Sequence, residues 1–493
     1  MQLVLVGFSF LHRRAKTKQQ NQATGPRKDI AMDLRNRAKD RQCRAFCKTV
    51  ALIAAPIILQ SVFTIGVNMM DTMMLGRYGE VQLSGSSLAN EFIHIFQILC
   101  MGIGGGAAVL TAQYWGAGDI KALRRTITIM LRFCIMIALG FTLATIAWPA
   151  QIMRLFTPEA DVIEKGVLYL RISAFTYLFF GVMQTMSIVL RSVRLMRIPL
   201  MVSISAFFVN VFFNWVFIYG NLGAPEMQIE GAALATLISR VFEFSFVMVY
   251  VLIIDRRISY RVRDFFRPCG ELVRVFFRYS LPVIFSDSLL AVGNSVVAVI
   301  GGHIGMVFVS ANAIISQIVR LSTVFNQGIS QASSIIVGNT LGEGDRKKTY
   351  QRGRTLIKLS LAAGIFAGIV VLVLSPPIVR FFNVTQETVR VAGQLSYSVA
   401  IMVVFQALQS VLTKGVLRGG GDTLFLVVAD VVFLWLASIP LGYLAGLVLK
   451  VPPFWVYMAL KIDYILKTLL CLYRFKTKKW IRRVTASQPI LPD

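Results

Sequence analysis

An internal repeat is the feature that most constrains this chain, because the same residues return at a constant offset of 226 positions. The matched positions are prolines, asparagines, glycines and a charged turn: Pro56 and Pro282, Asn68 and Asn294, Gly102 and Gly328, Gly116-Ala-Gly-Asp119 and Gly342-Glu-Gly-Asp345. With one residue inserted, Val189-Leu-Arg191 returns as Val416-Leu-Arg418. A repeat of this length predicts two homologous halves built on one plan.

The composition places both halves in a membrane. Of the 493 residues, 56% are hydrophobic and 15% are charged, which is more apolar side chain than a soluble domain can bury. The six cysteines include no CxxC pair, so we expect neither a disulfide framework nor a zinc site.

Twelve apolar runs are long enough to cross a bilayer, which takes roughly 20 residues each. They lie at 48-75, 86-112, 126-149, 166-190, 199-219, 231-254, 279-302, 308-338, 356-376, 391-413, 424-449 and 453-473. Six runs per half mean that both halves enter the membrane from the same side, as parallel repeats. The predicted fold is an all-α membrane protein with twelve transmembrane helices in two homologous six-helix bundles. Such duplicated bundles are typical of alternating-access transporters.

Basic residues are concentrated in the loops expected on one side of the membrane. Of the 51 Lys and Arg residues, 37 fall before the first run, after even-numbered runs or in the tail, including three after the fourth run and two after the tenth, and Lys48 and Lys358 lie at the start of the runs that follow such loops. The positive-inside rule therefore predicts that both termini are cytoplasmic. The net charge of +27 is spread over loops without base-stacking aromatic motifs, which argues against nucleic-acid binding.

These observations divide the chain into five segments. They are a basic, disordered cytoplasmic tail at 1-45, a six-helix lobe at 46-254, a basic cytoplasmic linker at 255-278, a second six-helix lobe at 279-474 and a cytoplasmic tail at 475-493. The first eleven residues are too short to span and lack a cleavage site, so they do not resemble a signal peptide. Translation from Met1 and from Met32 are both compatible with this organisation.

Enzyme chemistry finds no support. The chain has no GxxxxGK[ST] phosphate loop, and its three histidines are too dispersed for a metal cluster. The glycines at 102–106 lie inside an apolar run with no preceding strand, which favours close helix packing or a flexible point over a dinucleotide site. We expect no cofactor, and an ion gradient as the energy source.

A carboxylate at bilayer depth costs roughly 3 kcal/mol or more unless it is protonated, paired or hydrated. Asp71 in the first run has Asn68 and Thr64 at helical spacing, so three oxygen-bearing side chains share one face. These oxygens suit a hard monovalent cation. The alternative is that Asp71 caps its helix or pairs near Arg77. The polar residues of the fifth and sixth runs that could join it are Asn210, Asn214 and Thr236, although the Asn pair could equally make interhelical hydrogen bonds.

Asp287 has no acidic counterpart in the first half, so it is either a substrate or second proton site or a structural pair with a neighbouring helix. We group it with Asn68, Asn294 and Thr64 as that candidate site. Asp430 and the Lys461/Asp463 pair are interpreted as structural. Pro56 and Pro282 interrupt the first run of each half and predict either hinges or static bends.

Several motifs in this order resemble the multidrug and toxic compound extrusion (MATE) family of the multidrug/oligosaccharidyl-lipid/polysaccharide flippase superfamily, over nearly all of 45-485. They are Asp71-Thr-Met-Met-Leu-Gly76, Ala112-Gln-Tyr-Trp-Gly-Ala-Gly-Asp119, Leu190-Arg-Ser192, Gly231-Ala-Ala-Leu-Ala-Thr236 and Val416-Leu-Arg-Gly-Gly-Gly-Asp-Thr423. The resemblance implies a two-lobed bundle that exports cationic or amphiphilic drugs in exchange for Na⁺ or H⁺. It also implies that Asp71 is the coupling carboxylate, with Asn210, Asn214 and Thr236 as its partners.

We therefore predict a monomeric antiporter in the cytoplasmic membrane of a bacterium, with small cationic or amphiphilic molecules and the lipid bilayer as its partners. The coupling ion stays open, because some family members have an aspartate where Asn214 stands and others use acids on helices 7 and 10. The alternative is a lipid-linked oligosaccharide flippase of the same superfamily. It would need a cationic cavity, against which the few basic residues within the apolar runs argue.

Overall fold

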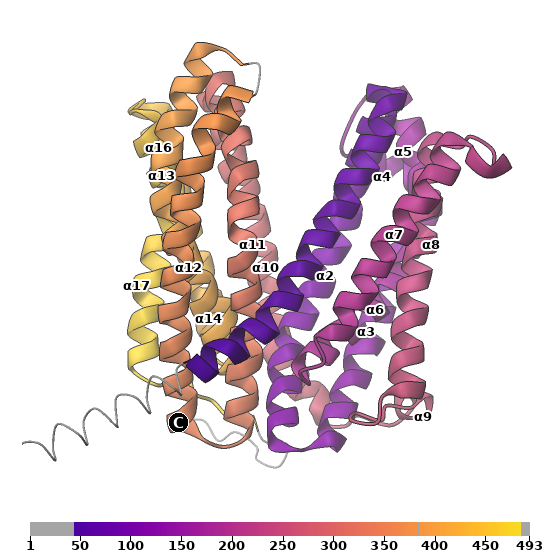
Figure 1. Cartoon of the computed structure of the whole chain (residues 1–493), viewed down its shortest axis with the longest axis vertical. Helices are drawn as coiled ribbons and strands as arrows, with labels where there is room; N and C mark the ends of the chain where they lie inside the picture. The colour runs from indigo at the N-terminus through magenta and orange to yellow at the C-terminus, as the bar shows by residue number, and fades with distance from the viewer. Residues whose placement is uncertain (1–43, 382–383, 485–493) are drawn as a thin grey trace, which may run out of the picture. The chain divides into compact units, whose positions relative to one another are not determined.

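The computed structural model describes residues 44–381 and 384–484, and in these ranges the chain is helical throughout, without a strand (Figure 1). Nine helices of this part are long and apolar enough to cross a membrane. Two further helix pairs pass the same test although they bend by 54° and 48°. The expected tail at 1-45 lies outside the described residues except for its last two positions.

The first half contains six spans. The first helix covers Arg44–Tyr78, and its last turn is the 3₁₀ helix η1 (Gly76–Tyr78). It is followed by α2 (Glu80–Ala117), α3 (Ile120–Ala147), the bent pair α5 (Ala160–Ser173) and α6 (Thr176–Ser192), α7 (Arg197–Tyr219), and α8 (Gln228–Val249) with its π-helical extension η3 (Tyr250–Ile254). Short helices α4 (Pro149–Arg154) and η2 (Asn221–Gly223) occupy connections, and α9 (Val262–Phe265) lies in the linker.

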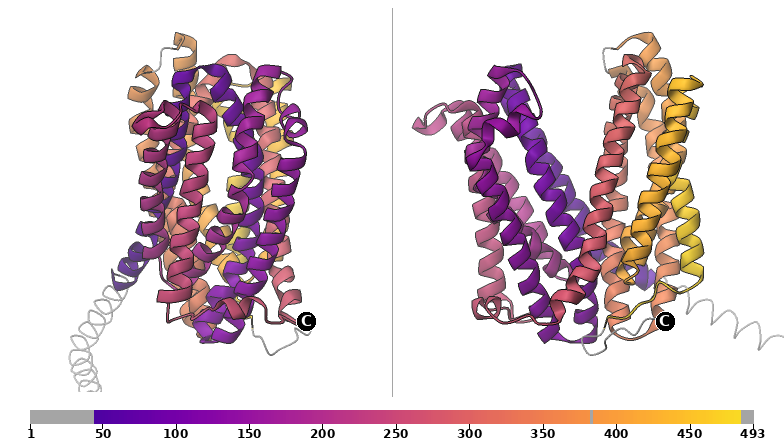
Figure 2. Two further views of the ribbon diagram at one scale, coloured as in Figure 1. Left: turned by 90° about the vertical axis from the view of Figure 1, so that its right-hand side faces the viewer. Right: turned by 180° about the vertical axis from the view of Figure 1, so that it is seen from behind.

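The second half repeats this order. Its long helices are α10 (Leu272–Ile304), α11 (Met306–Gly342), which bends near its middle, α12 (Arg346–Phe381), and α13 (Gln386–Ser410) with the π helix η4 (Val411–Leu417). The eleventh span is assembled from α14 (Thr423–Phe433), η5 (Leu434–Ser438), α15 (Ile439–Tyr443) and η6 (Leu444–Val448). The twelfth apolar run is broken into α16 (Pro453–Leu460) and α17 (Asp463–Lys476). Figure 2 shows these helices lying alongside one another in two further views.

Matched glycines bring the two halves together. A Cβ on Gly116 of α2 would lie 2.1 Å from the backbone oxygen of Asn339, and a Cβ on Gly342 of α11 would lie 2.1 Å from that of Gln113. Since Asn339 is the repeat equivalent of Gln113, the contact is reciprocal. The two helices approach closely because neither has a side chain at the crossing.

A second matched pair of glycines makes reciprocal contacts earlier in α2 and α11. Gly102 of α2 faces the Cα of Ile284, and Gly328 of α11 faces the side chain of Ile58, which is the repeat equivalent of Ile284. The glycines at 104 to 106 also face side chains or backbone of α6 and α10, and Gly105 faces the guanidinium of Arg418 as well. The prediction of close helix packing for this glycine run is therefore confirmed.

The Gly-x-Gly-Asp sequences form tight turns. Gly118 and Gly344 have φ values of +74° and +91°, in the left-handed region that glycine favours. In each turn the aspartate accepts a backbone hydrogen bond at the start of the next helix, from Ala122 N at 2.9 Å and from Lys348 N at 2.8 Å. The turns therefore end one span and begin the next.

The segment after α17 packs against both halves up to the last described residue. Trp480 is fully buried, and the amide of Arg482 donates to the carbonyl of Gly420 at 2.9 Å. The amide of Val484 donates to Oε1 of Gln113 on α2 at 2.8 Å, and Gln113 Nε2 donates to the carbonyl of Gly419 at 3.3 Å. The expected C-terminal tail at 475-493 is thus an ordered part of the packing through residue 484.

Candidate functional site

Asp71 lies half-buried in the first helix and meets the amides predicted for it. Asn214 Nδ2 donates to Asp71 Oδ1 at 2.5 Å and is also 3.0 Å from Asn210 Oδ1. Both asparagines are fully buried because they lie one turn apart on the face that α7 turns inward. The buried oxygens Asn214 Oδ1 and Thr236 Oγ1 have no hydrogen-bond partner among the described residues.

No basic side chain of the described residues lies within ion-pairing distance of Asp71. The nearest candidate on α8, Arg240, pairs instead with Glu243, with 2.6 Å between Nη1 and Oε2. A carboxylate with an amide donor, beside the unpartnered Asn214 oxygen, is chemically suited to a proton or a small cation.

Thr64 and Asn68 do not join this cluster, which corrects the prediction that they line one face with Asp71 as ligands. Both side chains are exposed, and Thr64 Oγ1 donates to the carbonyl of Gln60 in its own helix at 3.0 Å. Helical periodicity places the three residues on neighbouring positions, but only Asp71 is covered by α7. The first helix and α10 run through Pro56 and Pro282 without a break, so the hinge assignment stays a prediction.

Asp287 on α10 forms the structural pair that the sequence allowed as an alternative. Its Oδ1 is 3.3 Å from Nη2 of Arg418, which follows η4. Asn294, about two turns further along α10 on the same face, donates to the carbonyl of Leu290 and accepts from Nζ of Lys461 at 3.2 Å. Lys461 therefore does not pair with Asp463, contrary to the sequence interpretation.

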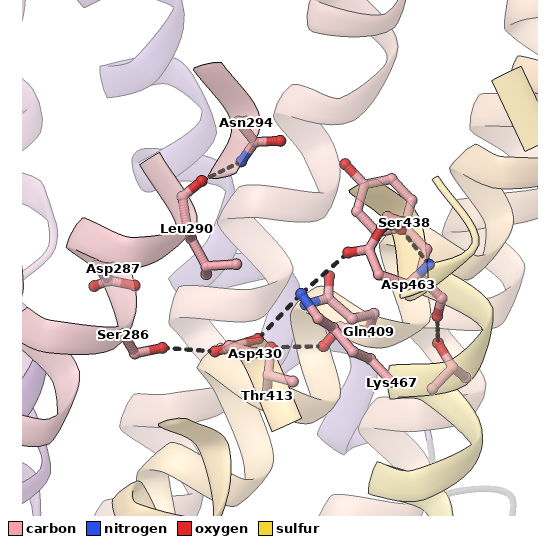
Figure 3. A network of polar contacts seen from close by, with 12 residues as sticks. Ser286, Asp287, Leu290, Asn294, Gln409, Thr413, Asp430, Ser438, Asp463 and Lys467 are labelled. Carbon is pink, nitrogen blue, oxygen red and sulfur yellow. Dashed lines mark hydrogen bonds and ion pairs between the residues drawn. The ribbon is translucent and has the colours of Figure 1, made fainter. Parts of the chain in front are cut away.

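A buried triad of charges holds α14 and α17 together (Figure 3). Lys467 Nζ lies 3.0 Å from Asp463 Oδ2 and 3.5 Å from Asp430 Oδ1. Asp463 also accepts from Ser438 Oγ at 2.9 Å, and Asp430 accepts from Ser286 Oγ at 3.0 Å. All three charged side chains are at most 3% exposed, so the interpretation of Asp430 and Asp463 as structural fits the geometry.

A cavity of about 470 Å³ lies between the two halves of the repeat. Its walls come from α2, α6, α10, α11, α13, η4 and α17, a volume and location that suit a drug-sized ligand. Many uncharged polar side chains contribute to the lining: Gln184, Ser192, Asn294, Thr323, Asn326, Gln327, Ser330, Gln331, Ser334, Gln406, Gln409 and Ser410. The charged lining residues are Arg191, Asp287, Lys414, Arg418, Asp463 and Lys467.

The MatE family model matches residues 56–216 and 282–444, once in each half of the repeat. The chain belongs to the MatE family. A probable multidrug resistance protein NorM from Thermotoga maritima is 25% identical over 452 residues, covering 90% of this chain and 94% of its own length. Another, from Mesorhizobium japonicum, is 25% identical over 474 residues, covering 93% and 99%.

Solved structures share the fold. A MATE crystal structure in a bent conformation superposes with a TM-score of 0.79 at 16% identity, covering 88% of this chain and 96% of its own. A MOP superfamily transporter from Pyrococcus furiosus gives 0.78 at 16% identity, covering 87% and 95%. The predicted fold of twelve helices in two repeats is confirmed, as are a multi-pass membrane protein and a transporter that is not an enzyme.

Three basic residues of this MATE transporter were misplaced by the sequence analysis. Arg191, Lys414 and Arg418 were counted with the loops after the fourth and tenth apolar runs, whereas the structure places them on the cavity wall. The fourth span continues to Ser192, and η4 carries the tenth span to Leu417. Arg191 and Arg418 are repeat equivalents, and that match was the signal that could have marked them as a pair.

Proposed function

We propose that this protein is a secondary active transporter that exports small amphiphilic molecules across the bacterial cytoplasmic membrane in exchange for Na⁺ or H⁺. In this proposal both termini are cytoplasmic, in agreement with the side on which the loop lysines and arginines gather. The names of the multidrug resistance relatives support export of organic molecules. The absence of a phosphate loop from the sequence supports an ion gradient as the energy source.

The observation that carries the proposal is the state of Asp71. The acidic residues of the second half that lie among the helices, Asp287, Asp430 and Asp463, each have a basic partner within 3.5 Å. Asp71 has no basic partner within this distance in the described part of the chain, and it accepts a hydrogen bond from the neutral Asn214 amide. A half-buried carboxylate at this depth therefore needs a proton or a cation to neutralise it, which is the requirement of a coupling site.

Neutralisation of Asp71 changes what Asn214 and Asn210 can bind. When a cation is present, Asn214 Oδ1 and Thr236 Oγ1 are free to serve as further oxygen ligands, since neither makes another hydrogen bond in the described part of the chain. When the cation leaves, the charged carboxylate must regain donors from neighbouring helices. A tenfold difference in cation affinity between the two states supplies about 1.4 kcal/mol to the conformational change.

The test is gradient-driven dye transport by the full chain in proteoliposomes, with sodium and pH gradients imposed separately and with dyes of either charge. Asp71→Asn is expected to abolish uphill accumulation under both gradients while the protein still inserts and purifies normally. Asp161→Asn, which changes an exposed aspartate of the same half, is the matched control and should transport as the wild type does. Wild-type accumulation by Asp71→Asn would refute Asp71 as the coupling residue.

The flippase alternative has gained one supporting observation. The sequence argument against it was the scarcity of basic residues within the spans, yet four basic side chains line the cavity. A fluorescent lipid with an anionic headgroup, scored for movement between leaflets of the same proteoliposomes, separates the two functions.

A further inference from the structure

The charges of the cavity point to a substrate that the relatives' names do not specify. Four basic side chains line it against two acidic ones, Asp287 and Asp463. The net charge that a ligand meets depends on which of the four basic side chains are already paired within the protein.

Two of the four basic side chains, Lys467 and Arg418, form ion pairs within the protein. Lys467 is held between Asp430 and Asp463 and is 2% exposed, so its charge is more than matched. Arg418 pairs with Asp287 through Nη2, but its Nε is buried and has no hydrogen-bond partner in the described residues. Arg418 therefore keeps an unused donor on a side chain that is largely buried at the cavity wall.

The other two have no acidic partner. Arg191 donates from Nη1 to the amide oxygen of Gln331 at 2.7 Å and from Nε to the carbonyl of Ser187 at 3.2 Å, and both acceptors are neutral. Lys414 is exposed on the cavity wall, and no hydrogen bond or ion pair joins it to a described residue. Two positive charges thus lie uncompensated at the cavity surface.

One turn of α11 brings these cations to the same region. Gln331 accepts the hydrogen bond from Arg191. Ser330 and Ser333 of the same turn face Gly415, the residue after Lys414. Gly419, the residue after Arg418, faces Ser334 of the same turn. Since Arg191 and Arg418 are repeat equivalents and both line the cavity, each half contributes one of two matched guanidinium groups.

We propose that the transported molecule carries an oxyanion, such as a carboxylate, sulfonate or phosphate, which is bound by Arg191 and Lys414 with the free Arg418 Nε close by. A guanidinium is a planar fork of donors that matches such groups, and Arg191 retains unused donors after its two hydrogen bonds. A purely cationic molecule would meet two uncompensated like charges, which opposes binding. The apolar remainder of the molecule faces Met101, Ile188, Leu290 and Ile335 in the same cavity. This assignment rests on the proposed export function.

The experiment compares three probes in proteoliposomes of the full chain under an imposed sodium or pH gradient. Carboxyfluorescein is the soluble anion, ethidium is the cation, and a fluorescent phosphatidylglycerol tests a lipid headgroup as the source of the oxyanion. We expect carboxyfluorescein accumulation that falls about tenfold or more in Arg191→Gln and in Lys414→Gln, and is largely retained in Arg191→Lys. Lys358→Gln, which removes an exposed lysine of α12 outside the cavity lining, should leave transport unchanged.

The outcomes separate the two proposals. Ethidium transport that Arg191→Gln and Lys414→Gln leave unchanged or accelerate, with no carboxyfluorescein transport, overturns the oxyanion assignment and leaves the export function standing. Lipid movement that depends on Arg191 and Lys414 supports the oxyanion site and makes the headgroup its ligand. Failure of all three probes under both gradients overturns the export function and this assignment together. Lys414 is exposed, so its variant tests the assignment even if the arginine variants do not fold.

Discussion

An alanine at position 116 should destabilise the protein by forcing α2 and α11 apart. Its Cβ would lie 2.1 Å from the backbone oxygen of Asn339, whereas contacts of real Cβ atoms essentially never fall below 3.0 Å. The two backbones must therefore separate by about 0.9 Å, because no flexible side chain at the crossing can yield. Overpacking of this kind typically costs about 1–3 kcal/mol.

Because the contact is reciprocal, the repeat predicts the same effect at the equivalent glycine of the second half. Gly342→Ala places its Cβ 2.1 Å from the backbone oxygen of Gln113, so it should lower the stability by a similar amount. The control is Gly140→Ala on α3, where an added Cβ meets nothing within 4 Å. Removing a glycine from a helix interior stabilises by about 0.5–1 kcal/mol when the new side chain is unopposed.

The assay is thermal unfolding of the purified variants in one detergent. We expect Gly116→Ala and Gly342→Ala to lower the midpoint together and Gly140→Ala to hold or raise it. If either crossing variant melts at or above the wild-type temperature, or if the two differ in direction, the reciprocal contact between the halves is wrong.

Two further predictions concern the second half and use the same unfolding assay. Lys467→Met should lower the free energy of unfolding by about 3–5 kcal/mol, because it leaves the carboxylates of Asp430 and Asp463 buried without their cation. Adding Asp463→Asn should recover part of this stability. Equal unfolding midpoints for the single and double variants would contradict the triad. Trp480→Ala should cost about 3–5 kcal/mol because Trp480 is fully buried and its Nε1 donates to the carbonyl of Phe475, while Lys479→Ala, at an exposed neighbour, should change nothing. A wild-type midpoint for Trp480→Ala would mean that the segment after α17 does not pack as described.

The fold could be predicted because two strong signals coincide. The hydrophobic spans determine the number of crossings, and the constant offset between the halves determines that they are parallel repeats. The structure preserves this offset where Gly116 and Gly342 meet, because an insertion before either glycine would move it out of the close contact between α2 and α11.

The candidate site could be predicted only in part. The cost of a carboxylate at bilayer depth marked Asp71 as a residue that needs polar neighbours, and the family resemblance implied Asn214 as one of them. Periodicity could not say that α7 covers Asp71 but leaves Thr64 and Asn68 exposed, since that depends on how two helices cross.

Charged residues near helix ends were the main source of error. Arg191 and Lys414 lie within one or two turns of the ends expected from hydropathy, so a small extension of each span moves them from a loop to the cavity wall. The sequence interpretation paired Asp463 with Lys461, but Lys461 lies in the break between α16 and α17. Lys467, four residues after Asp463 on α17, faces it instead.

The strap formed by residues 477–484 has a consequence for the order of biosynthesis. Gln113 leaves the ribosome early, in the second span, yet its side chain is satisfied by the backbone of residues near the end of the chain. These hydrogen bonds of Gln113 cannot form in the nascent first half before the strap has been synthesised. The strap can therefore join the ends of α2 and α11 only after both halves have been synthesised, and a chain that stops before Trp480 contains every described span but lacks these contacts.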